Sequence, residues 1–230
     1  MAETLRVGII GTGRAGQCHA AAFSRLPDVA VTGLWNRTRS RAEKLAAALG
    51  GPDIEIYQDW RDLIERGAVD IVSITADPLL RQGPFAQALA RQRHVLVEKP
   101  LSLDLPQARE MASLAAHART VTAISFNWRY SPGCQTTWRA IREGQIGRPL
   151  DIRTEWRMRS SPALRPWSQV GGSLREAGSH EFDRVRFLAG WRFQRLVYSL
   201  RSPPETNART LEKHQFRAAQ TESRAGAAKG

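Results

Sequence analysis

Short apolar runs alternate with longer stretches of mixed polarity through the first half of the chain. The runs VGII, VAVTGLW, DIVSIT and HVLVE have the length and composition of strands buried on both faces of a sheet. The stretches between them, such as the alanine-rich segment 38–49, have helical periodicity. The alternation predicts an α/β fold with a parallel sheet over residues 1–122.

The pattern changes after Asn127. Pro132 opens a predicted helix, and residues 151–158 and 193–200 read as strands. A second domain is therefore predicted over residues 123–200. Residues 201–230 lose apolar periodicity and are predicted to form a disordered tail.

Composition excludes several classes of protein. Of the 230 residues, 42% are hydrophobic, but no apolar run approaches the roughly 18 residues that would span a bilayer, so no membrane association is expected. The formal net charge is +12, yet the arginines are scattered and accompany no nucleic-acid-binding motif, so no nucleic-acid partner is expected either.

The cysteine spacing is evidence on metal binding, and the first residues of the chain are evidence on cellular location. Cys18 and Cys134 have no metal-ligand spacing, so no metal is expected and both read as reduced thiols. The start MAETLRVGII enters a strand directly, without the pattern of a signal peptide, and this favours the cytoplasm.

A glycine-rich turn follows the first predicted strand. It reads GTGRAG, which comprises Gly11, Thr12, Gly13, Arg14, Ala15 and Gly16. In the dinucleotide-binding pattern the first glycine permits a tight turn, the second lets the backbone approach a pyrophosphate, and the third lets helix pack on strand. The helix after the turn would direct its unpaired N–H groups at that pyrophosphate. We interpret these residues as cofactor-binding; the alternative is an ordinary turn.

Arginines cluster after the second predicted strand. Asn36 ends that strand, and Arg37, Arg39 and Arg41 follow. An acidic residue here would bind the ribose of NAD, whereas a small neutral residue beside arginines suits a 2′-phosphate. The pattern favours NADP, with NAD as the alternative. A simpler interpretation is that the arginines only face solvent.

Two further strand ends supply candidate contacts. In an open parallel sheet, ligands bind outside the C-terminal ends of the strands. We therefore assign cofactor contacts to Thr75 and Ala76 at the C-terminal end of the fourth predicted strand, and to Glu98 and Lys99 at that of the fifth.

A predicted helix over residues 173–189 places three polar side chains near one another. Glu176, His180 and Asp183 fall on neighbouring positions of one face. A carboxylate one turn from an imidazole can orient it as a general base. The alternative is a surface salt bridge.

Five motifs together resemble the Gfo/Idh/MocA oxidoreductases, named for glucose-fructose oxidoreductase, inositol dehydrogenase and a rhizopine catabolism protein. They are GTGRAG, HVLVEKPLS, FNWRYSP, GQIGRP and GGSLREAGSHEFDRVRFLAG, in the family's order over residues 5 to 200. The resemblance implies a Rossmann dinucleotide-binding domain followed by an α+β domain with an open sheet.

The resemblance also implies roles for residues. Lys99 holds or polarises the substrate oxygen and His180 removes the hydroxyl proton, with Glu176 as its acidic partner. Arg129 and Asp183 join Lys99 and His180 as expected substrate contacts. The implied activity is hydride transfer between NAD(P) and a hydroxyl or carbonyl group of a sugar, polyol or related small molecule.

The sequence departs from the family in three respects. Glu176 stands where aspartate is common, and Arg81 stands where a histidine is often found, which would change the electrostatics near the cofactor. Family members are also longer, so the second domain is expected to be incomplete at its C-terminal side. Its unfinished sheet would have an edge able to form a homo-oligomer. The rival hypothesis is a truncated, catalytically inactive dinucleotide-binding protein, either a remnant or a sensor.

Overall fold

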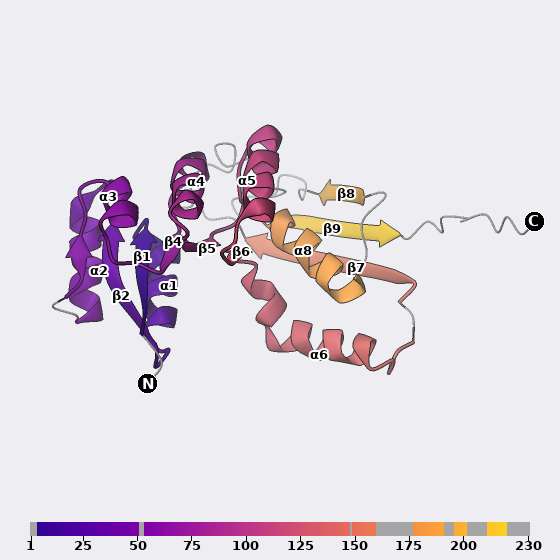
Figure 1. Cartoon of the computed structure of the whole chain (residues 1–230). Coiled ribbons are helices and arrows are strands. Elements are labelled where there is room, and N and C mark those ends of the chain that lie inside the picture. The colour runs from indigo at the N-terminus through magenta and orange to yellow at the C-terminus, as the bar shows by residue number, and fades with distance from the viewer. Residues whose placement is uncertain are drawn as a thin grey trace, which may run out of the picture. The chain divides into compact units, whose positions relative to one another are not determined.

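The chain forms two compact units. The computed structural model describes residues 4–50, 53–147, 149–159, 177–190, 196–201 and 211–219. The division falls between Ser125 and Phe126, shortly after the boundary predicted between residues 122 and 123. Figure 1 shows the course of the chain through both units.

The first unit is built on a parallel six-stranded sheet. Its strand order is β3-β2-β1-β4-β5-β6, so the chain builds outward from β1 in one direction and then returns to build outward from β4 in the other. This reversal between β1 and β4 creates the switch point at which open α/β sheets bind ligands. The strands are β1 (Leu5–Ile10), β2 (Val29–Trp35), β3 (Glu55–Ile56), β4 (Ile71–Ile74), β5 (His94–Val97) and β6 (Thr122–Ile124).

Helices connect successive strands of this sheet. They are α1 (Arg14–Phe23), α2 (Arg39–Leu49), α3 (Trp60–Glu65), the 3₁₀ helix η1 (Pro78–Leu80), α4 (Gln82–Ala90) and α5 (Leu105–His117). Aspartates begin three of them: Asp59 accepts from the backbone of Arg61 at 2.9 Å, Asp77 from that of Leu79 at 3.1 Å, and Asp104 from that of Gln107 at 3.1 Å. Such caps satisfy N–H groups that a helix start leaves unpaired.

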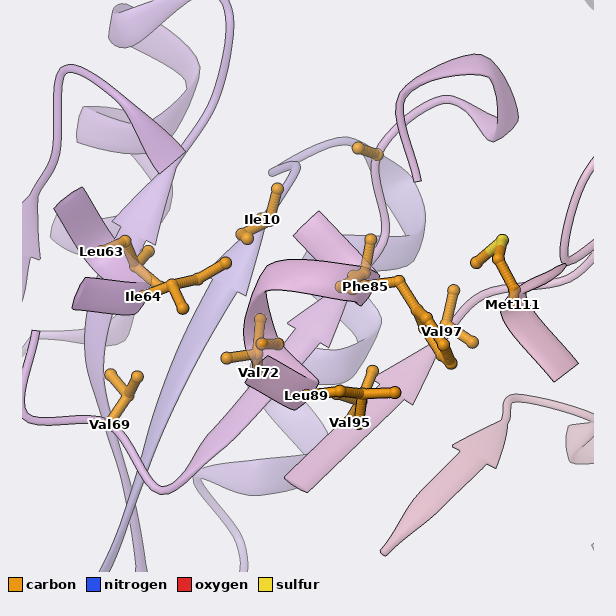
Figure 2. Close-up of a cluster of buried hydrophobic side chains, with 13 residues drawn as sticks. Ile10, Leu63, Ile64, Val69, Val72, Phe85, Leu89, Val95, Val97 and Met111 are labelled. Atoms are coloured by element: carbon orange, nitrogen blue, oxygen red, sulfur yellow. The ribbon is translucent and has the colours of Figure 1, made fainter. Parts of the chain in front are cut away.

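Alternating residues of β1 pack into two separate cores. Val7 and Ile9 belong to a cluster with side chains of α1 and α2, whereas Ile10 belongs to a larger cluster with side chains of α3, α4 and α5. Figure 2 shows this larger cluster around β4 and β5. Burial of each large aliphatic side chain contributes about 1.5 to 3 kcal/mol, which makes the sheet a rigid support for the loops at its ends. The Rossmann-like fold predicted from the strand and helix alternation is confirmed.

The second unit combines helices with a three-stranded antiparallel sheet. The described elements are the 3₁₀ helix η2 (Asn127–Tyr130), α6 (Pro132–Arg142), β7 (Asp151–Arg159), α8 (Gly178–Ala189), β8 (Leu196–Arg201) and β9 (Leu211–Ala219). The strand order is β7-β9-β8. Residues 173–176, the predicted start of the helix that contains His180, lie outside the described residues.

The prediction of a disordered tail over residues 201–230 is wrong for residues 211–219. These residues form β9, which pairs with β7 along its whole length and with β8 on its other side. The backbone of β9 pairs with a strand on each side. Backbone hydrogen bonds of this kind form without alternating apolar residues in the sequence. In the part of the chain that the structure describes, no helix is long and apolar enough to cross a membrane.

Candidate functional site

The glycine-rich turn joins β1 to α1 at the switch point of the sheet. Gly11 has φ of +101°, and a side chain there would also meet the backbone nitrogen of Ala76 at 2.6 Å. A Cβ on Gly16 would run into the carbonyl oxygen of Gly11. Gly11 therefore makes the turn, and Gly16 permits close contact between helix and strand.

Gly13 lies under a different constraint. Its backbone is extended, with φ of −71° and ψ of −167°, and apart from Gly13 and its two chain neighbours no heavy atom of the described chain lies within 4 Å of the place where its Cβ would be. Beside it, the hydroxyl of Thr12 is buried and has no hydrogen-bond partner within the described residues. No acidic side chain lies in the first turn of α1, so nothing there competes for the N–H groups of the helix start. An open backbone position, an unpaired hydroxyl and a helix N-terminus together fit the pyrophosphate of a dinucleotide.

Asn36 braces this turn from the end of β2. Its Oδ1 accepts from the N–H of Thr12 at 3.0 Å, and its Nδ2 donates to the carbonyl of Thr38 at 3.0 Å. Arg39 is engaged with Glu43, Nε to Oε1 at 2.8 Å.

The other arginines of the predicted phosphate site remain available to a ligand. Arg37 and Arg41 are exposed and form no ion pair with any described residue. Arg14, at the start of α1, is exposed as well. Ala15 is half-buried beside it.

Thr75 and Ala76 support the turn from the end of β4. The hydroxyl of Thr75 donates to the carbonyl oxygen of Gly11 at 2.5 Å, and its N–H donates to the carbonyl of Ile10 at 2.9 Å. Ala76 is buried against Gly11. The structure therefore brings together three of the predicted cofactor segments, at the ends of β1, β2 and β4.

A histidine that the sequence analysis missed links α1 to the end of β5. His19 Nδ1 lies 2.8 Å from the hydroxyl of Ser73, and its Nε2 lies 3.2 Å from Glu98 Oε1 and 3.3 Å from the hydroxyl of Ser125. The other carboxylate oxygen of Glu98 accepts from the N–H of Lys99 at 2.9 Å. His19 follows Gly16 by three positions on α1, and residues at this spacing lie on the same face of a helix. This spacing was the signal from which the sequence could have placed His19 on the same side of the helix as the glycine-rich turn.

The environment of Glu98 keeps its carboxylate ionised. Burial raises the pKa of Glu98, but the hydrogen bond and charge of His19, the hydroxyl of Ser125 and the charge of Lys99 together outweigh burial and hold the pKa below its ordinary value. A charged carboxylate therefore lies directly before Lys99 in the chain and accepts a hydrogen bond from its N–H.

Arg81 binds the backbone on both sides of Lys99. The buried guanidinium donates from Nε to the carbonyl of Ala76 at 2.9 Å, and from Nη1 to the carbonyls of Glu98, at 2.5 Å, and of Pro100. The sequence analysis expected Arg81 to act on the electrostatics of the cofactor. Its hydrogen bonds tie the end of β4 to the loop that carries the half-buried Lys99.

His180 lies in the second unit, near the start of α8. Its ring is buried and stacks on Trp128 with the ring centroids 4.4 Å apart and an interplanar angle of 8°. Phe126 meets the same ring edge-on at 6.2 Å. Glu176, the predicted partner of His180, lies outside the described residues.

Asp183 and Arg129 bind each other. The guanidinium donates from Nε to Oδ2 at 2.6 Å and from Nη2 to Oδ1, and this hydrogen bonding raises the pKa of Arg129. Both had been expected to contact substrate. A second buried acid that the sequence analysis missed, Glu181, accepts from Arg184 at 2.6 Å.

No group of three or more metal-ligating side chains occurs among the residues that the structure describes. Lys99 belongs to the first unit and His180 to the second.

Comparison with known proteins matches both units. Residues 5–126 match the family model described as "Oxidoreductase family, NAD-binding Rossmann fold". The chain belongs to the Gfo/Idh/MocA oxidoreductase family. Residues 134–226 match that family's C-terminal domain, so most of the segment predicted as a tail is part of a family domain.

Relatives at moderate identity agree with this membership. The rhizopine catabolism protein MocA of Rhizobium meliloti is 31% identical over 80% of this chain and 57% of its own length. Myo-inositol 2-dehydrogenase of Thermotoga maritima is 27% identical over 81% of this chain and 55% of its own length. The crystal structure of an NAD binding oxidoreductase from Klebsiella pneumoniae matches with a TM-score of 0.75 and 31% identity, covering 86% of this chain and 56% of that one. The chain thus spans little more than half the length of these relatives.

Proposed function

We propose that the chain is an NADP-dependent oxidoreductase that transfers hydride between the nicotinamide and the carbon of a hydroxyl or carbonyl group in a sugar, polyol or related small molecule. The observation that carries the proposal is the open space at Gly13 beside the unpaired hydroxyl of Thr12. A turn that only connected strand to helix would have no need for either. The inositol dehydrogenase among the relatives supports a polyol as the substrate class.

The chain's own residues would divide the work as follows. The turn from Gly11 to Gly16 and the N-terminus of α1 would bind the pyrophosphate. When bound, the nicotinamide supplies the hydride acceptor. His180 would accept the hydroxyl proton, and the ammonium group of Lys99 would stabilise the developing negative charge on the substrate oxygen. Glu176 is proposed as the partner that orients His180.

Arg129 and Asp183 remain proposed substrate contacts, now as an ion pair instead of two separate groups. Because the guanidinium takes both carboxylate oxygens of Asp183, a sugar hydroxyl would meet a pair with little net charge. Such a pair suits a neutral polyol better than a charged substrate.

The preference for NADP rests on Arg37 and Arg41. Both are exposed and form no ion pair with a described residue. Position 36 is an asparagine, so it has no carboxylate to bind a ribose hydroxyl. A cytoplasmic location and assembly through the second-unit sheet also remain proposals.

The test begins with cofactor titration of the wild-type chain by calorimetry, followed by assays of NADPH formation with inositols and sugars. His180→Asn and Lys99→Ala should each lower turnover by about 100-fold or more, because general-base catalysis and charge stabilisation contribute on that order. Lys44→Ala and His117→Asn are matched controls, since both residues are exposed on helices α2 and α5. Firm NADPH binding without turnover of any polyol would favour the non-enzymatic dinucleotide-binding alternative.

A further inference from the structure

The indole of Trp128 covers one face of the imidazole of His180. The rings are nearly parallel, with centroids 4.4 Å apart, while Phe126 approaches the imidazole with its ring turned by 74°. Both aromatic residues come from the segment at and just before η2, and His180 comes from α8. Rotation of the imidazole about its Cβ–Cγ bond would break the stack, so these contacts favour one ring plane.

The charges near this stack cancel in pairs. On α8, Glu181 accepts from Arg184, and Asp183 accepts from Arg129 of η2. On α6, burial raises the pKa of the Cys134 thiol, which keeps it neutral.

The remaining charged side chains that the structure describes on the packed elements are exposed, so solvent screens their charge. They are Arg139 and Arg142 of α6, Arg186 of α8, and Asp151 and Arg153 of β7. The π face of the indole is then well placed to stabilise positive charge on the imidazole.

A competing cation is present on the same indole. The guanidinium carbon of Arg184 lies 5.7 Å from the centroid of the Trp128 ring. Because this guanidinium also donates to Glu181, its charge is already partly neutralised. The indole can therefore interact with an imidazolium at a modest cost in repulsion.

We propose that Trp128 is a positioning residue for His180. Its indole holds the imidazole in the plane from which the ring nitrogen takes the substrate's hydroxyl proton, and it stabilises the imidazolium that this transfer produces. The inference rests on the proposed function, in which the proton moves to His180 as the hydride leaves the same substrate for the nicotinamide.

A spectroscopic test needs no substrate. A protonated imidazole in contact with indole quenches its fluorescence more than a neutral one does, because it accepts charge from the excited ring. Wild-type emission should therefore fall in a step as the pH is lowered and the imidazole becomes protonated. The step should vanish in Trp128→Phe and in His180→Asn.

The chain offers a matched control for this step. Trp138 of α6 stacks on Phe187 of α8, with centroids 5.6 Å apart and an interplanar angle of 13°. Trp138→Phe removes a comparable indole without touching His180, so the step should persist in it. A step of wild-type size in Trp128→Phe would overturn the contact on which the inference rests.

Kinetics test the catalytic consequence. Trp128→Leu should lower kcat by about 10- to 30-fold, and Trp128→Phe, which keeps an aromatic face, by about 3-fold. The affinity for NADPH should stay within about twofold, since the dinucleotide loop lies in the other unit, and Trp138→Leu should turn over normally. Equal kcat values for Trp128→Leu and Trp138→Leu would overturn the positioning role and leave the proposed function intact. A wild-type chain that binds NADPH and oxidises no polyol would instead overturn the proposed function and the catalytic part of this inference.

Discussion

Replacing Gly13 by valine should separate cofactor binding from folding. The backbone at Gly13 is extended, a conformation that valine adopts readily, and the described chain leaves free the space that its Cβ would take. The apo fold should therefore accept the substitution. A dinucleotide that approaches the turn would meet the branched side chain.

The size of each effect follows from this geometry. Removing a glycine from a conformation that other residues tolerate changes the free energy of unfolding in the stabilising direction, by about 0.4 to 1 kcal/mol. A side chain that holds the pyrophosphate away from two N–H groups removes two charge-assisted hydrogen bonds, at about 1.5 to 3 kcal/mol each. Binding should then weaken by more than about 100-fold, since about 1.4 kcal/mol corresponds to tenfold.

Calorimetry with NADPH and thermal unfolding measure the two effects on the same samples. Gly13→Val should bind too weakly to titrate while unfolding at or above the wild-type temperature. Gly16→Ala is the contrasting variant, because its Cβ meets the backbone carbonyl of Gly11, and it should lose about 1 to 3 kcal/mol of stability or more. Wild-type affinity in Gly13→Val would refute the reasoning and leave GTGRAG as a connecting turn.

Three further predictions concern charged groups of the first unit. Arg37→Ala should weaken NADPH binding about tenfold or more and hardly change NADH binding; equal wild-type affinities for the two cofactors would contradict this. Arg81→Met deprives three carbonyl groups of their donor and should lower the free energy of unfolding in urea by about 3 kcal/mol or more, whereas the exposed Arg91→Met should cost less than about 1 kcal/mol. The pKa of Glu98 is lowered in the fold, so its contribution to stability is present above the ordinary value of 4.5 and is lost as the pH falls through the folded-state pKa. His19→Asn should reduce this loss in unfolding measured from pH 7 down to below the folded-state pKa of Glu98, and identical pH profiles would argue against the pairing.

The first unit was predictable because its signals are local. Each strand is a short apolar run, each helix has its own periodicity, and the glycine spacing marks the turn between β1 and α1. The contacts that complete the site are not local. His19 and Glu98 are separated by 79 positions, and Arg81 acts through carbonyl groups that every residue possesses.

The second unit was less predictable because ion pairs replace apolar packing on α8. Phe182, Val185, Leu188 and Ala189 stand at helical spacing, which would favour burial of all four, but of these only Val185 is buried. The structure buries Glu181 and Asp183 instead, and both have arginine partners. Hydrophobic periodicity takes no account of a carboxylate that an arginine neutralises, whether on the same helix, as Arg184 does for Glu181, or far away in the sequence, as Arg129 does for Asp183.

The place of β9 in its sheet has a consequence for biosynthesis. β9 is the last of the three strands to be translated, yet it lies between the other two. The six strands of the first unit are complete by Ile124, so that unit can fold while the ribosome is still extending the chain. The second sheet has no middle strand until Leu211–Ala219 has been made. A nascent chain arrested earlier would expose β7 and β8 as separate strand edges, which are the segments that chaperones must keep from pairing with neighbouring chains.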